Sequence, residues 1–206
     1  PCMDNDDYRR GRLSCHKQYG EATALLAADA LVTAAFEAVA SAPTQPQSRV
    51  QAAAHLAKAA GARGMLYGQE LDKHYETVRA SESELLELHA HKTGALIIAG
   101  VDLGCDAAQA DDALRTALQH YAAELGLVFQ IVDDILDVTA TTEELGKPVG
   151  SDVENDKTTF ITLYGLEGAR SLAKQHNDAA LAALADLGPE ADFLREMAVE
   201  LLIRSK

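Results

Sequence analysis

The sequence predicts an all-α protein, a helical bundle formed by one domain over residues 1–206. Apolar residues make up 48% of the chain, alanine and leucine dominate them, and the long apolar runs contain no proline. Such runs favour helices, whereas the alternation of β-branched and polar residues that indicates half-buried strands is rare. The length suffices for one hydrophobic core. We expect about seven or eight helices, with seams too rich in alanine for a strict heptad coiled coil.

The first half of the chain contains the clearest boundary signals. Residues 1–15 are polar and strongly charged, so no helix is expected there. A loop rich in proline over residues 41–48 separates the first two expected helices, with Ser48 as the N-cap of the second. Three glycines then indicate either a break or a tightly packed helix that continues through them. Ser81 and Glu84 have the spacing of a capping box. The helices expected in this half cover residues 19–42, 49–60 and 81–103.

The second half is predicted to contain three helices and one long irregular segment. The helices cover residues 106–138, 157–187 and 190–204, with Asp106 or Asp111 as the cap of the first. Gly188 and Pro189 break the chain before the last helix. Residues 139–156 contain two glycines and a proline that prevent a long regular helix. Irregular segments of this length in compact domains are usually functional.

The formal charge of −14 argues against nucleic acid or an anionic membrane surface as the partner, because both would repel the protein. The three cysteines are odd in number and lack metal-ligand spacing, which fits a reducing compartment. We find no signal peptide and no apolar run of transmembrane length, since residues 31–42 are too few. These features predict a cytoplasmic protein.

A cluster of carboxylates interrupts the apolar helix expected before the long irregular segment. Asp133 and Asp137 are four residues apart, so they share one helix face, while Asp134 points sideways. Two stacked carboxylates repel each other unless a positive charge lies between them. Oxygen ligands favour Mg²⁺ or Ca²⁺ over zinc. An alternative is a surface helix with a local acidic cluster.

Other charged residues are consistent with a metal and diphosphate site. Asp4, Asp6 and Asp7 precede Arg9 and Arg10, which is either a flexible terminus or a site for metal and anion. Lys92 interrupts an apolar helix, either as a side chain that reaches solvent or as a functional group, and Gly94 beside it can loosen the helix. Lys147 and Lys157 lie in or beside irregular backbone. Facing carboxylates with lysines and arginines around them suit a metal-bound diphosphate, and the apolar wall suits an apolar tail.

These residues occur in six motifs whose order resembles that of the trans-isoprenyl diphosphate synthases, most closely the bacterial farnesyl diphosphate synthases. The resemblance covers essentially the whole chain. The matching segments are residues 3–11, 68–72, 91–94, 129–137, 145–152 and 157–160. It implies an isoprenoid-synthase-type helical bundle around a central cavity. It also implies a homodimer with about three Mg²⁺ ions in each active site, which bind diphosphate oxygens.

The resemblance implies a role for each matching residue. Asp4 would bind metal from one wall and Asp133 from the opposite wall, with Asp137 as a further ligand or as a support through water. Arg10 would hold the diphosphate of isopentenyl diphosphate, and Phe129 would line the site of its tail. Arg9, Lys92 and Lys157 would hold the allylic diphosphate, with Lys147 and Gln130 assisting. Thr93 would support the allylic substrate where the helix bends.

The activity implied is condensation of an allylic diphosphate, dimethylallyl or geranyl, with isopentenyl diphosphate, and the expected product is farnesyl diphosphate. Alternatives are a geranylgeranyl diphosphate synthase and a catalytically silent subunit of a prenyltransferase. The family's first motif begins with two aspartates that would precede Pro1. We therefore expect that the N-terminal helices are lacking, and that these 206 residues alone have little or no activity.

Overall fold

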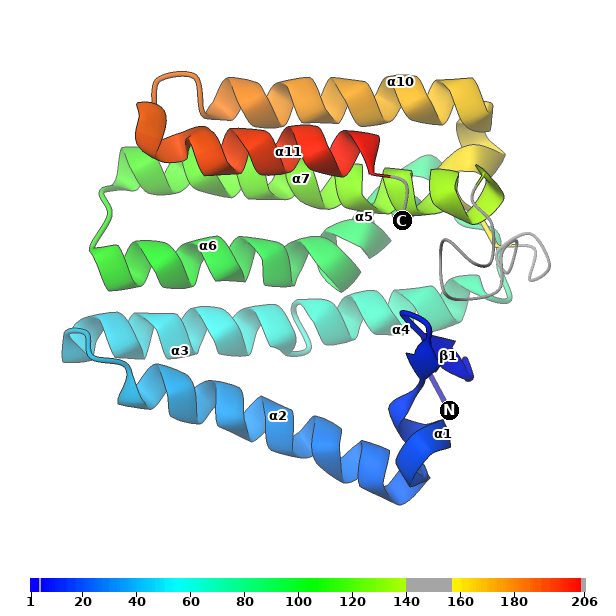
Figure 1. Ribbon diagram of the computed structural model, residues 1–206, viewed down its shortest axis with the longest axis horizontal. Coiled ribbons are helices and arrows are strands. Elements are labelled where there is room, and N and C mark those ends of the chain that lie inside the picture. The colour runs from blue at the N-terminus through cyan, green and yellow to red at the C-terminus, as the bar shows by residue number, and fades with distance from the viewer. Residues whose placement is uncertain (4, 140–156, 205–206) are drawn as a thin grey trace.

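The computed structural model describes residues 1–3, 5–139 and 157–204, and this part of the chain confirms the all-α prediction (Figure 1). One short hairpin, β1 (Tyr8–Arg9) and β2 (Arg12–Leu13), precedes the helices. The α-helices are α1 (Cys15–Tyr19), α2 (Glu21–Ser41), α3 (Pro46–Ala60), α4 (Met65–Tyr75), α5 (Glu82–His89), α6 (Ala95–Ala108), α7 (Asp112–Thr139), α10 (Phe160–Ala183) and α11 (Asp192–Ile203). A π-helical turn, η1 (Ala90–Gly94), joins α5 to α6, and a 3₁₀ turn, η2 (Pro189–Ala191), precedes α11.

The helices lie in successive layers, with α7 in the middle of the bundle (Figure 1). α10 and α11 cover one side of α7, and α6 covers the other, followed by α3 with α4 and then by α2. The core lies between α7 and α10, where Val128, Ile131 and Phe160 are almost completely buried. This packing makes α7 the rigid element that carries the carboxylates predicted to bind metal.

The charged N-terminal stretch forms a hairpin where the sequence suggested no regular element. Tyr8 pairs with Leu13 and Arg9 with Arg12. Arg10 and Gly11 form the turn with φ values of 52° and 71°. Two consecutive residues with positive φ are typical of the tight turn that suits the twist of a two-stranded hairpin. A local pairing of so few residues leaves little signal in the hydrophobic pattern.

Several predicted boundaries in the first half were displaced. Ser48 is not an N-cap, because α3 already begins at Pro46 and Ser48 is buried in its first turn. Proline suits the first helical position, since its fixed φ is helical and it needs no hydrogen-bond partner there. The chain breaks after α3 at Gly61. The helix after η1 continues beyond residue 103 to Ala108 and ends at Gln109, which has a left-handed φ of 54°.

The capping predictions were partly confirmed. Glu84 accepts a hydrogen bond of 2.7 Å from the backbone of Ser81, as in the predicted capping box. Asp111, one of two suggested caps, accepts from the backbone of Leu114 at the start of α7. The helix expected from residue 157 begins at Phe160. The predicted irregular segment lies outside the described residues except for residue 139, which ends α7, and the division into one domain stays a prediction.

The expectation that no apolar run reaches transmembrane length was wrong by the measures of length and composition. α2 has 21 residues and a mean hydropathy of 1.6, and it lies near the start of the chain. Within this structure α2 is largely exposed, and none of its residues is buried. Apolar residues that another surface covers would give the same composition, so hydropathy alone does not assign α2 to a membrane.

Candidate active site

One face of α4 contacts three other segments of the chain, each of which contains or adjoins a predicted site residue. Gln69, Asp72 and Glu76 are three and four residues apart, so they lie on the same side of the helix. The Nε2 atom of Gln69 donates to Met3 beside the predicted metal ligand Asp4, at 3.7 Å. The carboxylates of the other two residues face lysines from distant elements. α4 therefore forms a wall of the candidate site, to which the sequence analysis assigned no residue.

Lys92 forms an ion pair with Asp72, in which Nζ lies 2.7 Å from Oδ2. The side chain of Lys92 is 33% exposed and that of Asp72 is 17% exposed. The ammonium therefore points to a carboxylate at the helix interface and does not simply extend into solvent, while the role of Lys92 in substrate binding stays a prediction. Lys157 lies farther from its partner, with Nζ 3.9 Å from Oε1 of Glu76.

A close approach of two backbones positions Lys92. A Cβ atom built on Gly68 of α4 would lie 2.1 Å from the backbone nitrogen of Lys92, so any other residue would force the two elements apart. Lys92 lies in η1, the π-helical turn, which widens the helix where Gly94 was expected to loosen it. π-turns of this kind occur often at functional sites. The turn directs Lys92 to α4 and the next residue, Thr93, to α7.

Gln130 of α7 accepts two hydrogen bonds at one atom. Thr93 donates through Oγ1 to Oε1 of Gln130 at 2.6 Å. His89 approaches the same oxygen with Nδ1 at 3.2 Å. Thr93 and Gln130, which were both predicted to bind the allylic substrate, are therefore in direct contact. The side chain of His89, which the sequence analysis did not select, joins them.

Arg204 covers the first carboxylate of the aspartate motif. Its Nη2 atom donates to Oδ1 of Asp133 in a short contact and to the backbone oxygen of Phe129 at 3.3 Å. Its guanidinium lies 4.4 Å from the centre of the Phe129 ring. The carboxylate of Asp133 is 43% exposed. The side chain of Asp133 is thus partly open to solvent, and the guanidinium of Arg204 balances its charge.

Asp137 is buried on the same face of α7, and only 3% of the residue is exposed. Neither carboxylate oxygen has a hydrogen-bond partner within the described ranges. A buried carboxylate is costly unless a cation or hydrogen-bond donors balance it. Together with Asp133 one turn away, this pair fits a hard divalent cation such as Mg²⁺, which binds few carboxylates and completes its shell with water and phosphate oxygens.

The middle aspartate has a structural role. Oδ2 of Asp134 accepts a hydrogen bond of 2.8 Å from the backbone of Phe160, the first residue of α10. It thereby satisfies a backbone donor that the start of a helix leaves without a partner. Asp134 points sideways, as predicted, and binds protein. The alternative of a solvated acidic cluster is wrong for Asp134 and Asp137, because both are buried.

The remaining predicted residues are not gathered at α7. Arg9 and Arg10 are exposed on the hairpin, whose N-terminal end reaches α4 through Met3. Asp4 and Lys147 lie outside the described residues. In the described ranges no group of three or more His, Cys, Asp or Glu residues could hold a metal ion. A metal at Asp133 and Asp137 would therefore need further ligands from water, substrate or Asp4.

Three residues that were not predicted as site residues form hydrogen bonds or ion pairs with residues that were. Asp72, His89 and Arg204 contact Lys92, Gln130 and Asp133, respectively. Asp72 lay inside a recognised motif, and this was the available signal. Arg204 had no comparable signal, since it follows an ordinary amphipathic helix. Its role depends on where α11 ends beside α7.

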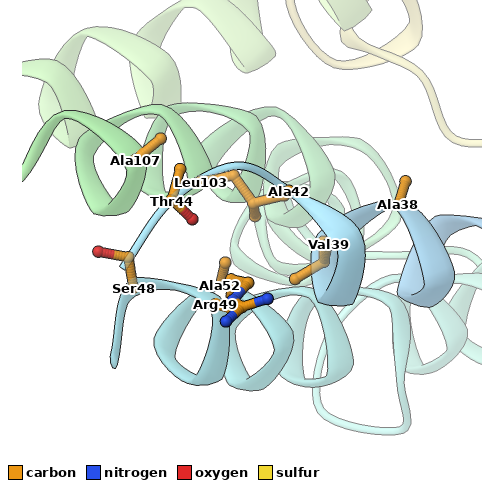
Figure 2. A pocket seen from close by; sticks show the side chains of 9 residues that line it. All are labelled: Ala38, Val39, Ala42, Thr44, Ser48, Arg49, Ala52, Leu103 and Ala107. Atoms are coloured by element: carbon orange, nitrogen blue, oxygen red, sulfur yellow. The ribbon is translucent and has the colours of Figure 1, made fainter. Parts of the chain in front are cut away.

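A separate cavity of about 250 Å³ lies where α2 turns into α3 (Figure 2). Leu103 of α6 and the side chains of Ser48 and Arg49 contribute to its lining. Arg49 donates to the backbone oxygen of Ala40 at 3.0 Å, so its guanidinium links the start of α3 to the end of α2. The lining contains no carboxylate. None of its lining residues belongs to α7, the helix that carries Asp133 and Asp137.

The chain is similar to known prenyl diphosphate enzymes. A family model described as polyprenyl synthetase matches residues 2–189. Farnesyl diphosphate synthase of Micrococcus luteus is 41% identical over 206 residues, which are all of this chain and 71% of that protein. A chloroplastic geranylgeranyl pyrophosphate synthase of Catharanthus roseus is 43% identical over 193 residues, which are 92% of this chain and 54% of that protein.

A solved structure shows the same fold. The geranyltransferase of Helicobacter pylori, complexed with magnesium and isoprenyl diphosphate, matches with a TM-score of 0.86 at 37% identity. The match covers 98% of this chain and 66% of that chain. The chain thus spans between about half and 71% of the length of these three relatives. The family match over most of its length and the shared fold lead to one conclusion: the chain belongs to the polyprenyl synthetase family.

Proposed function

We propose that this protein is a Mg²⁺-dependent short-chain trans-prenyltransferase. It condenses dimethylallyl or geranyl diphosphate with isopentenyl diphosphate, and the product is farnesyl diphosphate. One observation carries the proposal: α7 presents Asp133 and Asp137 on the face where Gln130 meets Thr93 of the turn that carries Lys92. Carboxylates for a cation thus lie beside donors for a diphosphate, as a metal-bound diphosphate requires.

The diphosphate of the allylic substrate is assigned to the basic and amide groups around η1. Lys92 and Lys157 supply positive charge, and the face of α4 holds both of them through Asp72 and Glu76. Thr93 and Gln130 complete this subsite. Arg9 and Lys147 are assigned to the same group by resemblance. Arg10 is assigned to the diphosphate of isopentenyl diphosphate, and Phe129 to the site of its tail.

Asp133 and Asp137 would hold Mg²⁺, with Asp4 as a ligand from the opposite wall. When bound, Mg²⁺ supplies Lewis-acid stabilisation of negative charge on the departing diphosphate. The number of about three ions per site is taken from the resemblance to the trans-isoprenyl diphosphate synthases. Support for this assignment comes from Asp137, whose buried oxygens have no partner within the described ranges.

The chain's own residues then serve each step of the reaction. Lys92 and Lys157 stabilise diphosphate as the allylic C–O bond breaks and the electron pair leaves with the oxygen. The double bond of isopentenyl diphosphate attacks the allylic cation and forms the new C–C bond. A proton is lost to the released diphosphate, which restores a double bond. Apolar residues around the site exclude water, which would otherwise capture the cation.

A turnover assay on the full-length protein tests the proposal, with geranyl diphosphate, isopentenyl diphosphate and Mg²⁺. We expect a C15 product that disappears with EDTA and in Asp133→Asn. Asp186→Asn, which changes an exposed aspartate elsewhere, serves as the matched control and should retain activity. A C20 product would support the geranylgeranyl alternative, for which the similarity to the Catharanthus roseus enzyme speaks. A folded protein without any product would support the silent subunit.

The proposal includes a homodimer formed through α2. Leu25, Leu26, Leu31 and Val32 are each between 56% and 71% exposed on this helix. α2 also lies at one outer side of the stack of helices, with α10 at the other (Figure 1). A second copy that covers this face would remove its apolar surface from water.

We also propose a cytoplasmic location. The three cysteines are free thiols, which fits a reducing compartment.

A further inference from the structure

His89 contacts three segments that carry candidate site residues. It is the last residue of α5 and directly precedes η1, the turn with Lys92 and Thr93. Its Nδ1 atom lies 3.2 Å from Oε1 of Gln130 on α7. Its ring stacks on Phe160, with ring centres 5.3 Å apart and planes inclined by 23°. The ring therefore touches both helices that form the core beside the site.

The imidazole is neutral and its tautomer is determined by its partner. Burial lowers the pKa of His89 to about 4, so the ring carries no charge at neutral pH. Because Oε1 of Gln130 can only accept, Nδ1 of His89 must carry the hydrogen. The Nε2 atom is then an acceptor, and it is buried without a partner among the residues described. A neutral ring with hydrogen on Nδ1 satisfies the hydrogen bond between the ring and Gln130 of α7.

Two donors on one oxygen fix the orientation of the Gln130 amide. Thr93 and His89 both donate to Oε1, which uses both of its lone pairs. The amide nitrogen, Nε2, keeps its two hydrogens and has no hydrogen-bond partner within the described ranges. It is also not among the buried polar atoms that lack a partner there. If the amide rotated by half a turn, an acceptor would replace this donor. With its hydrogen on Nδ1, His89 would then face the amide nitrogen donor to donor, which opposes this rotation.

We infer that His89 is a positioning residue, which orients the Gln130 amide so that Nε2 donates to the allylic diphosphate. This inference rests on the proposed function, because it requires that a diphosphate binds beside Gln130. His89 itself need not touch the substrate. Thr93 belongs to the same arrangement, since it donates to the other lone pair of the oxygen.

Calorimetric titration of the full-length protein with geranyl diphosphate and Mg²⁺ tests this role. His89→Leu keeps apolar volume and removes the donor, so we expect the Kd to rise roughly tenfold, equivalent to one hydrogen bond. His89→Asn carries an amide donor near the place of Nδ1 and should restore most of the affinity. Leu88→Ala is the matched packing control, because Leu88 is a buried neighbour. It should lower the Tm without this loss of affinity.

A double-mutant cycle separates positioning from a general structural effect. In a Gln130→Ala background, His89→Leu should leave the Kd unchanged, because the amide that His89 orients is absent. An equal loss in both backgrounds would overturn the inference, as would a failure of His89→Asn to restore binding. If the unsubstituted protein bound no geranyl diphosphate at all, the proposed function and this inference would both be wrong. Normal binding with an additive cycle would overturn only the role of His89.

Discussion

Arg204 places its guanidinium on the carboxylate of Asp133 and over the ring of Phe129. The cation comes from the residue after α11, and its target is the first carboxylate of the aspartate motif on α7. Arg204 therefore lies against one of the two carboxylates that are proposed to hold a divalent cation. The carboxylate has two oxygens with further lone pairs, so a metal could bind beside the guanidinium, but the two positive charges would then repel each other.

Removal of this competing charge should strengthen metal binding. For Arg204→Gln we expect the affinity for Mn²⁺, measured by electron paramagnetic resonance without substrate, to rise about two- to fivefold. The gain is modest because Asp133 is partly exposed, and exposed ion pairs contribute about 0.2–1 kcal/mol. Arg170→Gln removes an arginine that pairs with exposed Glu167 and serves as the control. Unchanged or weaker binding in Arg204→Gln would show that Arg204 does not compete with metal.

Asp137→Asn should stabilise the metal-free protein and abolish its response to Mg²⁺. The substitution removes a buried charge whose oxygens have no partner in the part of the chain that is described. In EDTA we expect the Tm to rise by on the order of 4 °C, which for this size corresponds to about 1–2 kcal/mol. Differential scanning fluorimetry with and without Mg²⁺ measures both effects. A Mg²⁺-induced shift that persists in the variant would exclude Asp137 as a ligand.

Gly68→Ala should destabilise the protein and weaken diphosphate binding together. The new Cβ would meet the backbone of Lys92, which cannot move without shifting η1. Overpacking of this kind costs about 1–3 kcal/mol, measurable by urea unfolding. Gly100→Ala is the matched control, because a Cβ at Gly100 on α6 meets nothing within 4 Å. We expect that control to be neutral or stabilising, so equal losses in both variants would contradict the close approach.

The stability of the protein should fall between pH 7 and pH 5 through His89. Burial lowers the pKa of His89 to about 4 in the folded chain, whereas the unfolded chain takes up this proton near the ordinary value of 6.5. Acid therefore favours the unfolded state, and the loss at pH 5 amounts to about 2 kcal/mol. Urea unfolding across this pH range should show a shallower decline in His89→Leu. Identical slopes in both proteins would refute the lowered pKa.

A charge on α2 should separate the proposed dimer. Leu31 is 71% exposed, so Leu31→Glu changes little inside one chain but would bury a charge between two copies. Light scattering after gel filtration should give twice the chain mass for the unsubstituted protein and a single mass for the variant. Phe193→Glu, which changes an equally exposed residue on α11, is the control and should remain dimeric. A monomeric unsubstituted protein would reject the dimer.

Much of the local structure could be predicted because its causes are close together in the sequence. The capping box at Ser81, the shared face of Asp133 and Asp137, and the loosened helix at Gly94 each depend on neighbours within about one or two helical turns. The start of α3 was misplaced because Pro46 and Ser48 are both acceptable near a helix start. The resemblance to a family added the roles of Thr93 and Gln130, although it did not predict their contact.

The sequence alone determined the helical class, the apolar face of α7 and the carboxylates on it, since a helix repeats with a period that neighbouring residues already express. Only the tertiary structure decided which partner each of these residues meets. Lys92 with Asp72, Gln130 with His89 and Asp133 with Arg204 are separated by 20, 41 and 71 residues. Such pairs depend on how side chains of different helices interdigitate, and the periodicity of one helix carries no information about its register against another.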